Sequence, residues 1–216
     1  MDNAVFDIKV YGVEKRMPMI KNIMNKLNLT EDDVFLDDRP HGGDALYTSK
    51  KALLANPRFD ITHRVVLQDD VEVCNNFKQI VAEIIKTHPD KIIALFPWDF
   101  YLKAVVNNNP NLANQTPYVE NSRHVTGCGF ILPYQYIRSY LCYAEGHCHD
   151  KWFYEDQAWF DWAKENKITI LNTIPALIQH LGDESLIFKD KTLIRRTNFY
   201  EENPQANWNS QLIMYK

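Results

Sequence analysis

Residues 64–73 read RVVLQDDVEV, and this stretch decides the fold that we expect for the chain. The apolar run 65–67 predicts a buried strand, and the adjacent carboxylates of Asp69 and Asp70 follow it almost directly. In an open α/β sheet, ligands bind in the crevice beyond the carboxyl ends of the strands. Carboxylates at that edge suit Mg²⁺ or Mn²⁺, which take water and substrate phosphates as further ligands. A turn of solvated acids is the alternative interpretation. Glu72 follows as a third acid that would support the pair.

The flanking sequence alternates between segments of strand type and segments of helix type. Strands are expected at residues 7–13, 34–36, 64–67, 91–96, 124–132 and 168–174. Helices are expected at residues 16–27, 48–55, 134–143 and 151–166, and from a cap at Asn75 or Asn76 to residue 87. This order predicts an α/β fold in which a mostly parallel sheet is covered by helices on both faces.

Length and composition indicate a single globular domain. The chain has 216 residues, of which 45% are hydrophobic and 24% are charged. We expect one body over residues 1–187, with a C-terminal arm of residues 188–216 packed on it. The net charge of -4 gives no broad attraction for nucleic acid or for an anionic membrane.

The same sequence favours a cytoplasmic location. No apolar run approaches the roughly 20 residues that a membrane-spanning helix needs, so we expect no stable membrane insertion. The first residues lack a basic segment followed by an apolar core, so we expect no signal peptide and four reduced cysteines. A structural zinc site among Cys142, His147, Cys148 and His149 is an alternative, but no paired C-x-x-C element supports it.

Five short motifs, in order along the chain, resemble those of GT-A glycosyltransferases and are most similar to the bacterial lipopolysaccharide-type enzymes. They are GGDALYTSK at 42–50, LQDDV at 67–71, TGCGFIL at 126–132, YEDQ at 154–157 and PALIQHLG at 175–182. The resemblance covers about residues 5–187 and implies a Rossmann-like GT-A fold. One position departs from the family, because Gln68 stands where the family usually has Glu or Asp before the acid pair.

The resemblance implies a metal centre and a general base. Asp70 would be the direct ligand of Mn²⁺ or Mg²⁺, and Asp69 would contact the donor sugar or its ribose. His180 would supply a late metal or pyrophosphate ligand, although a histidine after an apolar run is as readily a packed, hydrogen-bonded residue. Asp156, with Glu155 beside it, would be the base of an inverting transfer. Acids near a helix start also stabilise the helix by themselves.

The donor would be a nucleotide sugar, with a UDP-sugar as the first expectation. The second expected strand ends at Asp37, Asp38 and Arg39. This is where the fold that the resemblance implies would bind the base of the nucleotide. Arg39, Lys50 or Lys51 would face the diphosphate, and arginine is suited to bidentate phosphate contacts. An ordinary solvated loop is the alternative at each of these positions.

The acceptor site would lie near the irregular stretch of residues 99–122, which is rich in Asn and Pro. Trp98 and Tyr101 at its root would stack on a sugar ring, and Gly127 would leave room for the acceptor. A glycan is the acceptor that the resemblance implies. A hydroxylated base in DNA, as with virus-encoded glucosyltransferases, is the alternative acceptor.

Together these features predict a metal-dependent glycosyltransferase that moves a sugar from a nucleotide-sugar donor to an acceptor hydroxyl, with inversion. Two other hypotheses remain open. The chain would be a nucleotide-sugar or glycan binding module if it had kept the fold and lost catalysis. It would be a phosphoester hydrolase if water, with no acceptor, attacked a substrate held at Asp69 and Asp70.

Overall fold

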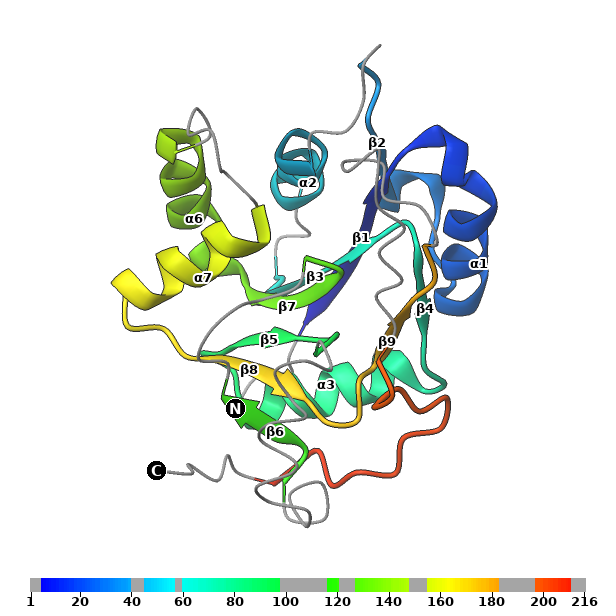
Figure 1. Cartoon of the computed structure of the whole chain (residues 1–216), viewed down its shortest axis with the longest axis vertical. Coiled ribbons are helices and arrows are strands. Elements are labelled where there is room, and N and C mark those ends of the chain that lie inside the picture. The colour runs from blue at the N-terminus through cyan, green and yellow to red at the C-terminus, as the bar shows by residue number, and fades with distance from the viewer. Residues whose placement is uncertain are drawn as a thin grey trace.

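A computed structural model of the chain describes residues 5–39, 45–56, 60–97, 116–120, 127–147, 155–182 and 197–210. A mixed sheet of seven strands lies at its centre (Figure 1). Its order is β2 (Val34–Leu36), β1 (Phe6–Gly12), β3 (His63–Gln68), β7 (Gly129–Pro133), β5 (Ile92–Ala94), β8 (Ile170–Thr173) and β6 (Tyr118–Glu120). Strands β7 and β6 run antiparallel to their neighbours, and the other five strands share one direction. The sheet is therefore mostly parallel, as the sequence predicts, with two reversed strands.

Helices cover both faces of this sheet (Figure 1). Helices α1 (Met17–Leu27) and α3 (Phe77–Thr87) bury their apolar sides on one face. Helices α2 (Ala45–Leu54), α6 (Tyr134–His147) and α7 (Glu155–Glu165) pack on the other face. Short 3₁₀ turns, η1 (Glu14–Arg16) and η2 (Glu31–Asp33), precede α1 and β2. The predicted α/β class with helices on both faces is confirmed.

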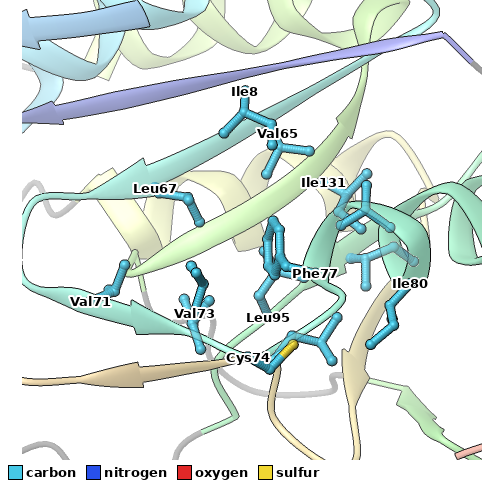
Figure 2. Packing of buried hydrophobic residues seen from close by; sticks show 14 of the residues in the cluster. Ile8, Val65, Leu67, Val71, Val73, Cys74, Phe77, Ile80, Leu95 and Ile131 are labelled. Carbon is cyan, nitrogen blue, oxygen red and sulfur yellow. The ribbon is translucent and has the colours of Figure 1, made fainter. Parts of the chain in front are cut away.

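A small second sheet continues directly from β3. It pairs β4 (Val71–Val73) antiparallel with β9 (Ile178–His180). Figure 2 shows Val71 and Val73 of β4 beside Leu67 of β3 and Phe77 of α3 within one apolar cluster. Asp69 and Asp70 form the tight connection between β3 and β4, so the packing of both sheets fixes where the acid pair lies.

Two local expectations hold only in part. Residues 118–120 form the edge strand β6, inside the stretch 99–122 that the sequence indicated as irregular. Asn76 is the N-cap residue of α3, as expected, but it lies in the left-handed region with φ 57° and makes no side-chain cap hydrogen bond. Residues 71–73 form β4, a strand in addition to the expected ones.

The described part of the C-terminal arm packs on the main body. Trp208 is buried, and the Tyr118 hydroxyl donates a 2.6 Å hydrogen bond to its carbonyl oxygen. The backbone N–H of Ala176 donates to the carbonyl of Phe199 at 2.9 Å. Within the described ranges, no helix combines the length and the apolar character needed to cross a bilayer.

The fully buried guanidinium of Arg64 ties β1, β3 and α2 together. Its Nε and Nη2 donate to the two carboxylate oxygens of Asp7 at 2.9 and 2.7 Å. Its Nη1 lies 3.1, 2.5 and 2.9 Å from the carbonyl oxygens of Ala52, Leu53 and Ala55. Ala52 and Leu53 belong to the last turn of α2 and Ala55 directly follows it, so their carbonyls have no further helical N–H to pair with. One side chain therefore neutralises Asp7 and caps a helix.

Replacing Asp7 with alanine should lower the free energy of unfolding by about 3 kcal/mol, because it leaves the Arg64 charge buried without its carboxylate. Urea unfolding followed by circular dichroism measures the change. Asp90→Ala is the matched control, since it removes the 3.1 Å pair of Asp90 with Lys91 at the surface. That control should cost less than about 1 kcal/mol. Equal losses in the two variants would contradict the special role of the buried pair.

Two buried histidines make the stability depend on pH. Burial lowers the pKa of His63 and of His88 below the ordinary histidine value, so the folded chain resists protonating them. Their stabilising contribution is complete above the unfolded pKa of about 6.5 and is lost as the pH falls below it. The free energy of unfolding should thus decrease from pH 7.5 to pH 5, by up to about 1.4 kcal/mol per pH unit for each histidine. Substituting both His63 and His88 with glutamine should reduce this dependence of the unfolding free energy on pH. The control substitution His147→Gln, at an exposed position, should not change it.

Candidate functional site

The acid pair lies at the carboxyl end of β3, beside the connection that follows β1. Asp69 and Asp70 are only 4% and 3% exposed, which excludes the alternative of a solvated acidic turn. Two ionised carboxylates at this depth need cations or hydrogen-bond donors close by. The surrounding residues supply both.

Three of the four carboxylate oxygens of the pair have described partners. The backbone N–H of Val13 donates to Oδ2 of Asp69 at 2.8 Å. Nη1 of Arg16 lies 2.9 Å from Oδ1 of Asp69 and 2.6 Å from Oδ2 of Asp70. Nε2 of His180 lies 3.2 Å from the same Oδ2 of Asp70. Oδ1 of Asp70 is buried and has no hydrogen-bond partner within the described residues.

The two carboxyl groups titrate differently because their surroundings differ. Burial raises the pKa of Asp69, and the charge of Asp70 raises it further against the opposing effects of Val13 and Arg16. Burial alone would raise the pKa of Asp70 as well. The hydrogen bond and charge of His180, together with the charge of Arg16, instead lower it below its usual value. Asp70 is therefore the member of the pair that holds its negative charge more firmly.

Two glycines let the backbone approach these carboxylates. A Cβ atom built on Gly12 would overlap the carboxyl group of Asp69. A Cβ atom on Gly182 would overlap Oδ2 of Asp70 and would lie 3.1 Å from the His180 ring. The backbone N–H of Leu181 donates to the carbonyl of Asp70 at 2.7 Å, which holds the end of β9 against the acid pair.

A second polar cluster lies on the other side of the β3 end. Gln68 and Asp69 are neighbours in the chain, and the alternation of a strand directs their side chains to opposite faces. A Cβ atom built on Gly127 would lie 3.5 Å from the Nε2 atom of Gln68 and 3.5 Å from the Cβ atom of Asp156. The Tyr11 hydroxyl donates to the Gly127 carbonyl at 3.0 Å. The structure thus brings Asp156 and Gly127 together next to the residue that precedes the acid pair.

The acids of this second cluster contribute to the raised pKa values of two buried tyrosines. Burial raises the pKa of Tyr11 well above its usual value, and the charge of Glu155 adds to the effect. Burial also raises the pKa of Tyr140 well above its usual value, with further contributions from Glu155 and Asp156. The backbone N–H of Gln157 donates to the Asp156 carboxylate at 2.9 Å, as expected for an acid in the first turn of a helix.

The residues expected to read the base follow β2 and lie beside the end of β1. The N–H of Asp37 donates to the Gly12 carbonyl at 2.9 Å, so Asp37 sits at the same edge of the sheet as the acid pair. Nε and Nη2 of Arg39 hold the two oxygens of Asp37 at 3.0 and 2.8 Å. Asp38 accepts from Lys51 at 2.9 Å on the surface. Their roles toward a donor stay predictions.

The remaining predicted site residues are more dispersed. Lys50 forms an ion pair with Glu145 of α6 at the surface. Glu72 is exposed on β4 and lies opposite Gln179, with no described contact to the acid pair. Trp98 and Tyr101 lie outside the residues that the structure describes.

Arg16, Tyr11 and Tyr140 complete the site and were not singled out from the sequence. Arg16 follows a strand that ends at Gly12, and a basic residue just after a parallel strand was the available signal. Tyr11 and Tyr140 resemble ordinary core aromatics in the sequence, and only the fold places their hydroxyl groups at the site.

The donor chemistry at this edge fits a divalent cation that is shared with a substrate. Across the described residues, no three His, Cys, Asp or Glu side chains converge as a metal-binding group. A cation at Asp69 and Asp70 would therefore complete its shell with water and phosphate oxygens, as Mg²⁺ commonly does. The unpartnered Oδ1 of Asp70 is the oxygen best placed to accept it.

The zinc alternative gains no support from the described residues. Cys142 is an exposed free thiol, and Nδ1 of His147 faces the Tyr143 carbonyl oxygen at 2.8 Å. The other members of that set, Cys148 and His149, lie outside the described ranges.

Comparison with known proteins assigns no family to the chain. Models of known protein families do not match it, and a search of curated proteins finds no significantly similar sequence. The functional conclusion therefore depends on the geometry of the site.

Substituting Gly12 with alanine should disturb the acid pair, because the added methyl group overlaps the Asp69 carboxyl. We expect a loss of about 1–3 kcal/mol of stability from this overpacking. Gly146→Ala is the matched control, since a Cβ there has no neighbour within 4 Å. The control should be neutral or stabilising by up to about 1 kcal/mol, because alanine favours a helix more than glycine does. Thermal unfolding of the two variants and the parent measures these changes. Unchanged stability in Gly12→Ala would contradict the close approach of the Gly12 backbone to the Asp69 carboxyl group.

Proposed function

We propose that this chain is a metal-dependent glycosyltransferase that moves a sugar from a nucleotide-sugar donor to an acceptor hydroxyl, with inversion. One observation carries the proposal. The acid pair Asp69–Asp70 and the acid Asp156 come from opposite halves of the chain, yet both lie at the end of β3, joined through Gln68 and Gly127. A transferase needs such an arrangement, with one set of groups at the leaving diphosphate and a separate base at the acceptor.

The acid pair supports binding of the donor. Asp70 keeps its charge at neutral pH and has one buried oxygen free of hydrogen bonds within the described residues. A divalent ion, when bound, supplies charge neutralisation for the diphosphate that departs. Asp37 lies beside Gly12 at the same edge, which suits recognition of the donor's nucleoside. A UDP-sugar is the donor that we would test first.

Asp156 supports the chemistry of the acceptor. Its carboxylate takes the proton of the acceptor hydroxyl while the acceptor oxygen bonds to the anomeric carbon and the bond to the diphosphate breaks. One displacement of this kind inverts the anomeric configuration. Gly127, held by Tyr11 through its carbonyl, leaves the space beside Asp156 without a side chain. A glycan hydroxyl is the acceptor that we propose.

The test combines donor binding with turnover. A thermal-shift screen of nucleotide sugars, with and without Mn²⁺, identifies the donor, and a ligand at a hundred times its Kd should add about 2.7 kcal/mol of stability. With that donor, Asp156→Asn should keep binding but lose about 10²–10⁴-fold in transfer rate, because the base is gone. NMR of the product reports its anomeric configuration.

Asp161→Asn is the control for that variant. Asp161 lies further along α7 and accepts a hydrogen bond from the Gln157 side chain at 2.9 Å. The Asp161→Asn variant should transfer sugar at the rate of the parent protein. A parent protein that binds the donor without any turnover would instead be a binding module, and full activity in Asp156→Asn would remove this residue from the mechanism.

A further inference from the structure

A single nitrogen atom of Arg16 bridges the two buried carboxylates. Nη1 lies 2.9 Å from Asp69 and 2.6 Å from Asp70, and the side chain is 17% exposed. An arginine commonly binds one carboxylate through two of its nitrogen atoms. Arg39 does so with Asp37, at 3.0 and 2.8 Å. The Nη1 atom of Arg16 instead lies between two carboxylates, where a point cation would be placed.

We propose that Arg16 is an internal counter-ion that competes with a divalent cation for Asp69 and Asp70, so that the cation binds only when the guanidinium leaves. This inference rests on the cation site of the proposed function. It goes beyond that site by assigning to a residue of the chain the control of when the cation can bind.

The electrostatics of the pair explain why a counter-ion is needed. Adjacent buried carboxylates repel each other, and Asp69 and Asp70 are 4% and 3% exposed. An unpaired charge at this depth would be strongly destabilising. In the protein without metal, the charge of Arg16 compensates the buried carboxylates and removes this destabilisation. A cation of charge +2 would compensate them equally well, so either Arg16 or the cation is sufficient.

The local backbone allows the exchange. Arg16 ends the short turn η1 (Glu14–Arg16), which has no buried residue. The turn that carries the guanidinium is therefore not itself anchored in the core. Gly12 and Gly182 hold the backbone so close that the carboxylates cannot move away from the bridge. The buried, unpartnered Oδ1 of Asp70 then remains as an oxygen that Arg16 does not use and a metal can.

Binding of Mn²⁺ alone to the full chain, without nucleotide, tests the proposal. Electron paramagnetic resonance of free Mn²⁺ gives the affinity. Arg16→Gln should bind Mn²⁺ about tenfold or more tightly than the parent, because the competing state is removed. Arg16→Lys keeps the charge and should bind like the parent. Lys15→Gln removes a charge from an exposed neighbour and should stay within about twofold of the parent.

Stability provides the second measurement. Arg16→Gln should melt at a lower temperature than the parent without metal and should recover more on addition of Mn²⁺. If Arg16→Gln does not fold without metal, Mn²⁺ should restore its native circular dichroism spectrum, and failure to do so would overturn the proposal.

The outcomes separate this inference from the proposed reaction. Equal Mn²⁺ affinity in Arg16→Gln and Lys15→Gln, or no Mn²⁺ binding by any of the proteins, would overturn the counter-ion role. If the two affinities were merely equal, sugar transfer by the parent protein with Mn²⁺ present would still support the proposed reaction. Tighter Mn²⁺ binding by Arg16→Gln, with no nucleotide sugar ever used, would support the counter-ion role and reject the reaction.

Discussion

The register between β1 and β3 is the constraint on which the site depends, and the buried pair of Asp7 and Arg64 fixes it. These two residues lie directly opposite each other in the parallel pairing. Five residues further along both strands, the same register brings Gly12 level with Asp69. A slip by one residue would turn every side chain of a strand to the other face. The salt bridge at one end of the strands thus determines which atoms meet at the other.

The acid pair and its surroundings form a site whose charges are arranged before any ligand arrives. Asp69 is held by a backbone N–H and a guanidinium, and Asp70 by the same guanidinium and an imidazole. On our proposal, only the guanidinium has to move when a cation binds, while the backbone and imidazole contacts stay in place. On the opposite face of the sheet, Asp156 acts on the buried hydroxyl of Tyr140, and Glu155 acts on the hydroxyls of Tyr11 and Tyr140. In the proposed reaction, the acid pair on one face would serve the donor and Asp156 on the other would serve the acceptor.

Much of the fold follows from patterns that the sequence shows openly. The apolar runs of β1, β3 and β8, and the amphipathic α1 and α3, are long enough for periodicity to reveal them. The position of Asp69 and Asp70 at a strand end follows in the same way. Strands β4 (VEV) and β6 (YVE) have three residues each, one of them an acid, whereas the equally short β2 (VFL) and β5 (IIA) are wholly apolar and could be recognised. The antiparallel direction of β7 depends on a crossover that local sequence does not encode. Arg16 was missed because a charged residue in a short turn looks like solvent-facing sequence until the fold brings it to the acids.

The connection between β3 and β4 has a mechanical consequence. Asp69 is anchored to the main sheet through Val13, whereas Asp70 is anchored to the small sheet through His180 and Leu181. Repulsion between the two carboxylates therefore acts between the two sheets, and the Arg16 guanidinium that lies between the carboxylates opposes it. The C-terminal segment is joined to the small sheet as well, because Gln179 exchanges hydrogen bonds with the backbone of Thr197 at 2.9 and 3.0 Å. The acid pair is thereby the point at which the main sheet is connected, through the small sheet, to residues 197–210.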